Sequence, residues 1–495
     1  MGIVIKQSAY ASLINYVGVV LGAVNIIFLF PVFLSKEEFG LMRAMLAMGI
    51  TLAPFAQMGL ARTTLRYIPR FSASEQTRGR FFAMILMLGG AAFGIFLVLF
   101  FLFDDWIFSF FSEKAPELKD QYWLILTLAF LLVYISILES YYKSLLNVVI
   151  PTFMKEFFLR ISGTLLAFLF FYHWIDFSLF LKLTVGSYAF SLLTLVLILA
   201  FKKQLNLSFS VFRIEKGFFK IMIRYSLIVM AGAIGTTIIL QIDQLMVTSY
   251  LGLASNAVYA VAFFMATVVD IPRKAIAQMS DSLIAKAFEF ERIDEVKKLY
   301  KQSSINQLII GCFVFLGIVL NLDNIYEIMP KGDDYSNGAI VVIIIGLAKL
   351  IDMGFGVNSE IIVSSKLYKA NIYFVVILAI LTVGLNTLLI PTYGLTGAAL
   401  ATLLAILCFN LLKMFYIWRY LKFQPFSWKS LIVLAYTTAI YFLVLQIPSL
   451  NNVYLNTLLV SSCITLTFII ATLAFKPSRE VHQLMRTALK YFRKE

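Results

Sequence analysis

Apolar residues occur along most of this chain in stretches of about twenty, separated by short polar segments. A bilayer core about 30 Å thick needs roughly 20 apolar residues for a helix to cross it. The stretches lack the alternation of polar and apolar positions that a membrane β-barrel requires. We therefore predict fourteen membrane-spanning helices, at residues 8–34, 39–61, 81–103, 121–146, 154–172, 177–200, 221–250, 254–272, 304–322, 337–365, 370–390, 394–418, 430–447 and 453–475.

Composition excludes an ordinary soluble protein. The chain is 61% hydrophobic and 14% charged, whereas soluble domains are about 45–50% apolar and about 25% charged. All three cysteines lie in apolar runs, so no disulfide framework is predicted. The two histidines are too few for a metal or catalytic cluster, and no nucleophile or phosphate-loop motif is present. We expect a chain that is not an enzyme, with no catalytic residues, no metal ligands and no cofactor.

Charge indicates how the chain is oriented. With a cytoplasmic N-terminus, the inner segments hold 34 of the 41 Lys and Arg residues, while the outer loops hold four lysines and twelve acids. Basic residues collect on the cytoplasmic side of membrane proteins. Both termini are therefore predicted to be cytoplasmic. Setting topology and meeting anionic lipid headgroups account for the net charge of +14 without any nucleic-acid partner.

The order of the stretches predicts a division into halves. The predicted parts are an N-terminal six-helix bundle (1–200), a cytoplasmic interfacial linker (201–220), a second six-helix bundle (221–420), two extra helices (421–475) and a basic tail (476–495). Segment 273–303 is also read as an amphipathic interfacial helix. A shift of 217 positions aligns residues 34–48 with 251–265, although only Leu34/Leu251 and Met48/Met265 are identical. Such repeats modestly favour a transporter.

Charged residues inside the spans are the main functional candidates, because a charge at bilayer depth is costly and usually faces a cavity or a partner. Lys349 and Asp352 share a helix face at i,i+3 spacing in the tenth span. A structural ion pair and a substrate or ion site are equally good interpretations. Glu360 lies eight residues beyond Asp352 on the same face, beside Asn358, and this polar stripe slightly favours a water-filled cavity.

Two further residues interrupt apolar spans. Asp243 stands between Gln241 and Gln244 without a basic residue nearby in sequence, so its partner must be another helix, water or a cation. Arg43 lies four residues inside the second span and either reaches the outer interface or acts in function. By contrast, three close pairs are predicted to be structural: Glu139 with Lys143, Glu156 with Arg160, and Asp270 with Arg273.

Two clusters of charged residues, one basic and one acidic, lie at the ends of predicted spans. Arg62, Arg66 and Arg70 recur every four residues at a cytoplasmic end. This stripe suits phosphate binding through forked guanidinium donors, but a topology anchor is the favoured interpretation. Asp104 and Asp105 imitate the acidic site of a membrane glycosyltransferase, yet the longest outer loop, of about 17 residues, is too short to hold an acceptor.

Three stretches carry a family resemblance: 34-LSKEEFGLMRAMLAM-48, 241-QIDQLMVTSYLGLASNAVYAVA-262 and 390-IPTYGLTGAALATLL-404. With the span count and both termini inside, they resemble the polysaccharide transporter (O-antigen/oligosaccharide flippase) branch of the multidrug/oligosaccharidyl-lipid/polysaccharide flippase superfamily. The third stretch is similar to the Pro-x-x-Gly-x-x-Gly-Ala-Ala start of the family's twelfth helix. Ala257 departs from the pattern, since the family usually has Gly there.

The resemblance implies two six-helix bundles around a central cavity, with two extra C-terminal helices. It also implies movement of a polyprenyl-pyrophosphate-linked oligosaccharide to the outer leaflet of a bacterial cytoplasmic membrane, for lipopolysaccharide or other surface polysaccharide biosynthesis. On this view Arg43 and Lys349 bind the anionic headgroup and Arg62 and Arg66 collect substrate. Cavity polarity, or coupling to a counter-moving proton or sodium ion, is assigned to Asp243, Asp352 and Glu360. Membrane lipids and polysaccharide polymerase or assembly proteins are the expected partners.

Three alternatives remain open. A cation-coupled multidrug exporter and a peptidoglycan-precursor flippase belong to the same superfamily. A membrane glycosyltransferase or ligase is the rival from another class. Arg43 and Lys349 argue mildly against an exporter of cationic drugs, because such substrates favour an acid-rich, base-poor cavity.

Overall fold

The computed structural model describes residues 2–71, 74–205 and 216–483, and every regular element in these ranges is a helix. Eleven of the described helices are long and apolar enough to cross a membrane. The all-α membrane fold class is therefore confirmed. The chain groups into two compact units, Met1–Ala260 and Val261–Glu495. The predicted bundle boundaries at 201–220 stay a prediction.

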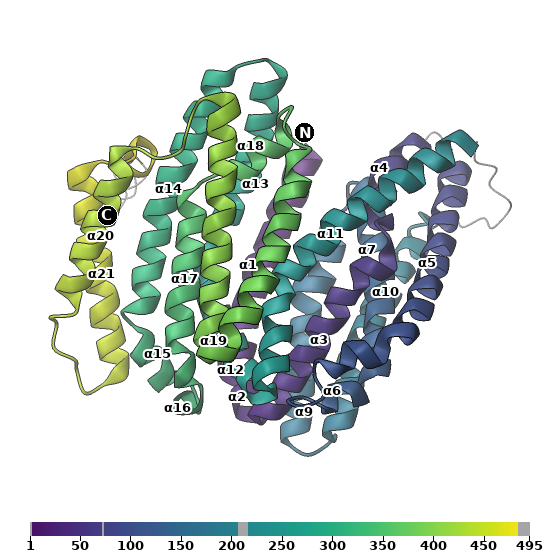
Figure 1. Ribbon diagram of the computed structural model, residues 1–495, viewed down its shortest axis with the longest axis horizontal. Coiled ribbons are helices and arrows are strands. Elements are labelled where there is room, and N and C mark those ends of the chain that lie inside the picture. Colours follow the sequence, from purple (N-terminus) through teal and green to yellow (C-terminus); the bar gives the residue numbers. More distant parts are fainter. Residues whose placement is uncertain (1, 72–73, 206–215, 484–495) are drawn as a thin grey trace. The chain divides into compact units, whose positions relative to one another are not determined.

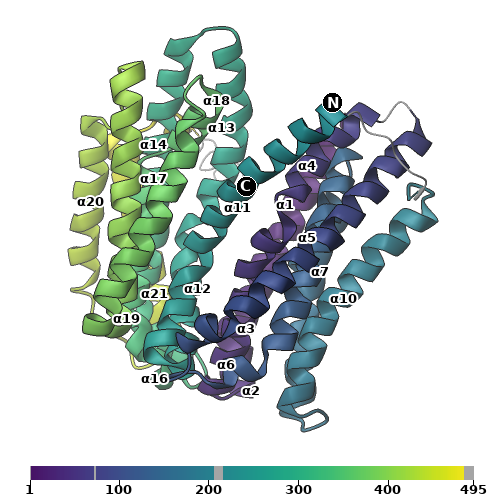
Figure 2. The same cartoon turned by 45° about the vertical axis from the view of Figure 1, so that its right-hand side comes forward.

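The first unit is built around α3 (Lys36–Gln57), which packs against α5 (Glu75–Ser109), α7 (Tyr122–Ser144) and α11 (Lys216–Leu251) (Figures 1 and 2). A capping box starts α3, because the Ser35 hydroxyl accepts from the Glu38 backbone N–H while the Glu38 carboxylate accepts from the Ser35 N–H. The unit's other elements are α1 (Gly2–Ala23), the π-helical η1 (Val24–Leu29), α2 (Phe30–Phe33), α4 (Leu60–Tyr67), the 3-10 helix η2 (Ile68–Phe71), α6 (Glu117–Asp120), α8 (Val149–Phe153), the π-helical η3 (Met154–Phe158), α9 (Leu159–Phe171), α10 (Phe177–Phe201) and the start of α12 (Leu253–Thr267).

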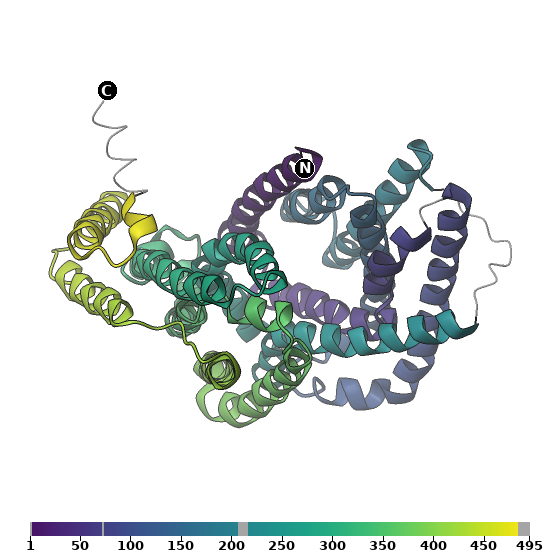
Figure 3. The same ribbon diagram turned by 90° about the horizontal axis from the view of Figure 1, so that it is seen from above.

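The central helix of the second unit is α14 (Ile293–Val319), which packs against α13 (Ile271–Glu289), α17 (Ala339–Gly354), α20 (Trp428–Val444) and α21 (Val453–Phe475). Seen from above, α20 and α21 lie at the edge of this unit (Figure 3). Buried side chains of α14, α20 and α21 form one apolar cluster there. The remaining elements are η4 (Val268–Asp270), α15 (Leu322–Ile328), α16 (Gly332–Tyr335), η5 (Ser336–Gly338), α18 (Asn358–Ser364) and α19 (Ala370–Leu421).

Helix α19 is 52 residues long because it contains two helices joined at Gly394. The chain reverses there (Figure 1), with φ 59° and ψ −135° at Gly394, a conformation that L side chains rarely adopt. A Cβ at Gly397 would lie 2.0 Å from the Leu389 carbonyl oxygen. The two glycines of the 390-IPTYGLTG-397 stretch are therefore required by this tight reversal. It separates the predicted spans 370–390 and 394–418.

Two predicted spans are not single helices. Span 39–61 is divided at Met58 and Gly59, which both have positive φ, and span 337–365 is divided between α17 and α18. Polar contacts hold the first break, since the Ser226 hydroxyl donates to the Met58 carbonyl over 2.7 Å. Every predicted span contains helix, but the number of fourteen membrane crossings stays a prediction.

Segment 273–303 is not a single interfacial helix. It forms nearly all of α13, a turn and the start of α14, and these two helices pack against each other. Ile284, Val296 and Tyr300 are fully buried in an apolar cluster that joins them to α18 and α19. Within the predicted linker 201–220 and tail 476–495, residues 206–215 and 484–495 lie outside the described part.

Candidate functional site

Arg43 of α3 is directed at a neutral partner within the first unit. Its Nη2 donates to Gln244 Oε1 of α11 over 3.1 Å, and the Tyr188 side chain of α10 lies within electrostatic range. Among the described residues, no carboxylate lies within ion-pair distance of Arg43, and its buried Nε–H has no hydrogen-bond partner. The guanidinium therefore carries an uncompensated positive charge on a membrane-spanning helix.

Asp243 is buried on α11, next to the residue that binds Arg43. Its Oδ2 accepts from the Tyr259 hydroxyl of α12 over 3.2 Å, so another helix, one of the three partners left open by the sequence, supplies a contact. Three residues earlier on α12, Asn256 donates to the Gly40 carbonyl over 3.1 Å and ties α12 to α3. Thus the two stretches aligned by the 217-residue shift contact each other directly.

The basic stripe lies beyond the break in the second span. Arg62 and Arg66 are on α4 and Arg70 is on η2, and all three are exposed. The Arg66 guanidinium lies 4.2 Å from the ring centroid of Tyr225 on α11, and that of Arg70 lies 5.3 Å from Phe218. Cation–π contacts of this kind orient a guanidinium while leaving its edges available for anions.

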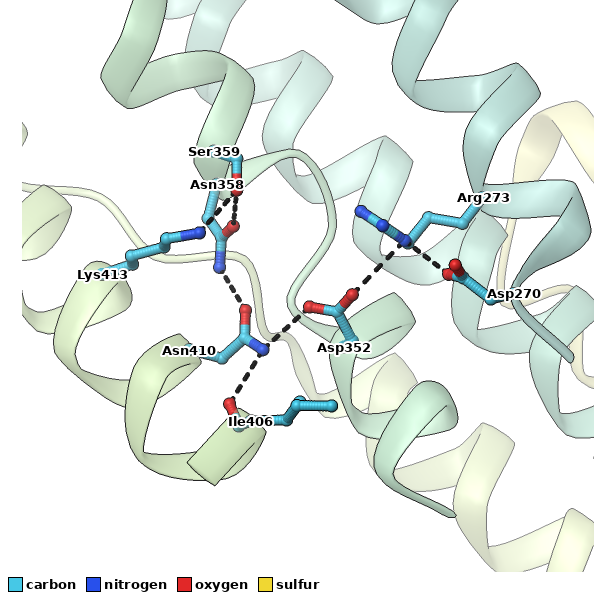
Figure 4. Close-up of polar contacts among 8 residues, drawn as sticks. All are labelled: Asp270, Arg273, Asp352, Asn358, Ser359, Ile406, Asn410 and Lys413. Atoms are coloured by element: carbon cyan, nitrogen blue, oxygen red, sulfur yellow. Dashed lines mark hydrogen bonds and ion pairs between the residues drawn. The ribbon is translucent and has the colours of Figure 1, made fainter. Parts of the chain in front are cut away.

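In the second unit, six charged residues gather around α17. We call them the α17 charge cluster, and they are Asp270, Arg273, Lys349, Asp352, Glu360 and Lys413. Arg273 Nε lies 2.6 Å from Asp270 Oδ1 and 3.3 Å from Asp352 Oδ2, so it joins the two carboxylates (Figure 4). Asp270 and Arg273 were predicted to be only an interfacial pair. Sequence spacing could not reveal the third member, which comes from another helix.

Asn410 of α19 links the parts of this cluster and is fully buried. Its amide donates to Asp352 Oδ1 over 2.8 Å and to the Ile406 carbonyl over 3.0 Å, and its Oδ1 accepts from Asn358 over 2.7 Å (Figure 4). Both ends of the Asn410 amide are therefore used. They hold α17, α18 and α19 in one arrangement.

Lys413 is the member of the cluster that sequence reasoning missed. It lies at the cytoplasmic end of the predicted span 394–418 and is one of the 34 basic residues that the sequence assigns to inner segments, but its side chain is 2% exposed. Nζ donates to Ser359 Oγ over 2.6 Å and lies 3.5 Å from the Phe409 ring centroid. Asp352 and Glu360 both lie within its electrostatic range. The available signal was Asn410 and Lys413 at i,i+3 spacing, the same spacing as Lys349 and Asp352.

A break in the helix brings Glu360 into the cluster. The prediction that Glu360 continues one helical face from Asp352 is wrong, because α17 ends at Gly354 and α18 starts at Asn358. Gly356 has φ +65°, and a Cβ there would lie 2.9 Å from the Ser304 backbone nitrogen. The Ser304 hydroxyl donates to the Gly354 carbonyl that the break leaves free, over 2.5 Å.

Lys349 does not form the ion pair that its spacing with Asp352 allowed. Among the described residues no carboxylate lies within 4.0 Å of its Nζ, which instead lies 5.7 Å from the Phe263 ring centroid of α12. Asp352 remains within its electrostatic range. The structure therefore removes the self-neutralising alternative and leaves Lys349 half-buried with its donors uncommitted to a carboxylate.

Another face of α17 has apolar surroundings. Leu350 and Ile351 border a groove of about 740 Å³ that is completed by Leu407 of α19 and by Trp428 and Leu431 of α20. Lys349 and Asp352 are absent from its lining. Helix α17 thus separates a polar group of charges from an apolar groove.

The remaining predicted pairs are local. Arg160 lies 2.6 Å from Glu156, and Lys143 lies 3.8 Å from Glu139. Asp105 is exposed and lies 2.9 Å from Lys119, so it forms an ordinary surface pair. Hydrogen bonding and the charge of Asp105 raise the pKa of Lys119. In the described part of the chain, no three His, Cys, Asp or Glu side chains are grouped so that they would hold a metal ion.

The model of a protein family, described as "Polysaccharide biosynthesis protein", matches residues 4–278, which is more than half of the chain. The chain belongs to this family. The match contains Arg43, the basic stripe, Asp243, Asp270 and Arg273, whereas the rest of the α17 charge cluster follows it. A search of curated proteins finds no match.

Several solved structures are similar to this chain in fold. The lipid II flippase MurJ in an inward closed conformation is 15% identical, with a TM-score of 0.75 over 94% of this chain and 98% of that chain. An inward-facing multidrug resistance MATE family transporter of the MOP superfamily is 13% identical, with a TM-score of 0.66 over 82% and 94%. A mutant of the Vibrio cholerae MATE transporter VcmN is 13% identical, with a TM-score of 0.54 over 85% and 98%.

Proposed function

We propose that the protein is a flippase for a polyprenyl-pyrophosphate-linked oligosaccharide. It would work by alternating access, from the inner to the outer leaflet of a bacterial cytoplasmic membrane, with both termini in the cytoplasm. Membership of the polysaccharide biosynthesis family and a fold like those of MurJ and MATE transporters support this proposal. The delivered lipid-linked glycan would then serve polysaccharide polymerase and assembly proteins.

The observation that carries the proposal is the state of Lys349. A lysine on a membrane-spanning helix is costly unless a partner or water compensates it, yet no carboxylate pairs with Lys349 in the described part of the chain. A pyrophosphate group would supply the missing negative charge and accept its donors. Arg43 in the first unit is similarly left with a neutral partner.

Other predicted residues take supporting roles in this proposal. Arg62 and Arg66 would collect the headgroup at the cytoplasmic side, where they are exposed. Asp243, Asp352 and Glu360 would supply polarity and couple movement to an ion gradient. A sugar headgroup needs such a polar path, because each hydroxyl that loses its water partners in hydrocarbon costs about 2–7 kcal/mol.

A peptidoglycan-precursor flippase is the second candidate, since the fold of MurJ fits 94% of the chain. A multidrug exporter of cations is less suited to the uncompensated charges of Arg43 and Lys349. The identity of the lipid that accumulates without the protein separates these functions.

The test is deletion of the gene in its host, followed by measurement of lipid-linked glycans in each leaflet. We expect the lipid-linked oligosaccharide to accumulate on the inner leaflet. Complementation with Lys349→Met should fail at normal protein level, and Lys349→Arg should restore part of the export. Lys182→Met is the matched control, because Lys182 lies on an exposed face of α10. Accumulated peptidoglycan precursor would favour the second candidate, and unmodified acceptor on the outer face would favour a ligase.

A further inference from the structure

The break between α3 and α4 is the point from which the basic stripe extends. Met58 ends α3 with φ 47° and ψ 36°, and Gly59 precedes α4 with φ 74° and ψ 7°. The left-handed conformation is unfavourable for a methionine, and an unbroken helix would satisfy its own carbonyls in a membrane without this strain. Because local structure does not favour the break, contacts with other helices must maintain it.

Ser226 of α11 holds this break from both sides. Its side chain is 2% exposed, and its hydroxyl donates to the Met58 carbonyl, at the end of α3, over 2.7 Å. The same oxygen accepts from the Thr63 hydroxyl, in the first turn of α4, over 3.1 Å. The backbones are also in close contact, since a Cβ at Gly59 would lie 2.1 Å from the Ser226 carbonyl oxygen. One serine thus fixes both helix ends relative to α11.

The residue before Ser226 contacts the basic stripe itself. The Arg66 guanidinium lies 4.2 Å from the ring centroid of Tyr225. The Tyr67 ring packs edge-on against the same ring, with 5.7 Å between the two centroids. Helix α4 packs against α11 at this level (Figure 1). Two adjacent residues of α11 therefore determine the direction of α4 and the place of Arg66 on it.

We propose that Ser226 is a positioning residue for capture of the diphosphate headgroup. By holding the break at Met58 and Gly59, it keeps the arginines of the basic stripe exposed on one face toward the cytoplasmic side. This inference rests on the proposed function, in which Arg62 and Arg66 collect the headgroup. Ser226 itself touches no substrate, because it is buried and acts through α4.

A positioning role of this kind has a kinetic signature. Exposed charges that attract a ligand over a distance raise its rate of association. Changes to such charges alter the association rate constant and its salt dependence, whereas changes to buried contacts with the ligand alter the dissociation rate constant. Loss of the Ser226 hydroxyl should therefore slow the arrival of the headgroup and leave its release unchanged.

The test measures both rate constants by stopped flow on the full chain in phosphatidylcholine nanodiscs. The probe is a water-soluble short-chain prenyl diphosphate ester of N-acetylglucosamine. Measurements are made at about 0.1 M and about 1 M salt, where charges are screened over about 10 Å and about 3 Å. At the lower salt concentration, Ser226→Ala should reduce the association rate constant by about two- to tenfold, the range of one ordinary hydrogen bond. At the higher concentration, it should match wild type.

Two neighbouring threonines supply matched variants. Thr63→Val should slow association as Ser226→Ala does, and Thr63→Ser, which keeps the hydroxyl, should restore the wild-type rate. Thr64→Val is the control, because Thr64 is equally buried but its hydroxyl donates over 2.8 Å to the Leu60 carbonyl within α4. It should keep both wild-type rate constants. Hydrogen exchange should be faster in α4 of Ser226→Ala and unchanged in the second unit.

Three results would overturn the positioning role while leaving the proposed function in place. They are a wild-type association rate in Ser226→Ala, an equal loss in Thr64→Val, and a loss that persists at high salt. Joint replacement of Arg62 and Arg66 by Gln should slow association at least as much as Ser226→Ala does. An unchanged rate in that double variant would overturn the collecting role within the proposed function, and this inference with it. No binding by the wild-type chain would overturn headgroup binding altogether.

Discussion

The two units keep charges inside their membrane-spanning helices in different ways. In the first unit, Arg43 binds the neutral amide of Gln244, and Asp243 accepts from the hydroxyl of Tyr259. In the second unit, Arg273 forms ion pairs with both Asp270 and Asp352, and Asn410 links Asp352 to α18 (Figure 4).

This difference teaches that charge in a membrane helix has two separate energetic meanings. A paired network is costly to break, because the remaining partner becomes an uncompensated buried charge. An unpaired cation is costly to keep, and its removal relieves that cost. The first situation describes Asp352 with Arg273, and the second describes Arg43 and Lys349. Stability and export should therefore respond in opposite ways to substitutions in the two groups.

The largest stability effect is expected at Asp352. Asp352→Asn keeps the shape but leaves Arg273 with one carboxylate, so the free energy of unfolding should fall by about 3–5 kcal/mol. Unfolding of the purified chain in detergent measures the loss, and hydrogen exchange should place it in α17, α18 and α19. The double variant with Arg273→Gln should lose less than the sum of the single variants, by about 0.5–3 kcal/mol. Strict additivity would show that these charges do not act as a network.

A smaller stability effect, with a large effect on export, is expected at Arg43. Arg43→Met loses the bond to Gln244, at about 1.5–3 kcal/mol, but relieves a membrane charge that costs about 2.5–3.5 kcal/mol. The free energy of unfolding should hence change little, while glycan export falls at normal protein level. An unfolding experiment on this variant measures its stability, and a surface-glycan assay measures its export activity. If Arg43→Met destabilised the chain as much as Asp352→Asn does, the two units would not differ in how they hold their charges.

Removal of the aromatic ring that contacts the basic stripe should lower stability modestly. Tyr225→Leu removes the ring that the Arg66 guanidinium contacts. The free energy of unfolding should fall by about 0.5–1 kcal/mol, as expected for an exposed cation–π contact. Faster hydrogen exchange in α4 and in the adjoining part of α11 would report it. Tyr225→Phe keeps the ring and serves as the control. An equal loss in both variants would assign the effect to the hydroxyl.

The smallest effect is expected at the exposed pair of Lys119 and Asp105, which contrasts with the buried pairs. The pKa of Lys119 is raised in the folded chain, first by its hydrogen bond to Asp105 and then by that charge. This contribution to stability is present below the ordinary lysine pKa of about 10.4 and is lost as the pH rises through the raised value. Asp105→Asn should return the Lys119 pKa toward its ordinary value, as measured by NMR of labelled lysine. Added salt should have the same effect.

Sequence periodicity was sufficient for the fold class, since all predicted spans contain helix. It could not predict the division of span 337–365. Glycines such as Gly354 and Gly356 are frequent in unbroken membrane helices, so they do not by themselves indicate a break. The deciding feature is the contact of Gly356 with Ser304 of α14, which lies about fifty residues away in the chain.

The site was predicted only in part, because its contacts also depend on residues far apart in the chain. Lys349, Asp352 and Glu360 were recognised as costly groups in apolar surroundings, but their partners depend on which helices pack together. Arg273 therefore seemed to belong to Asp270 alone, and Lys413 to the cytoplasmic loop. Polar spacing within a helix identifies a polar face, whereas only packing identifies what that face meets.

The order in which the cluster is synthesised has a consequence for membrane insertion. Arg273 precedes Asp352 by 79 residues, so a counter-ion is already present when α17 emerges. Lys413 follows Asp352 by 61 residues, a delay of roughly 3–12 s at about 5–20 residues per second. Arg273 is thus a partner for insertion of α17, and Lys413 joins an existing site. Loss of Arg273 should therefore appear first as inefficient biogenesis, before any defect in a finished molecule.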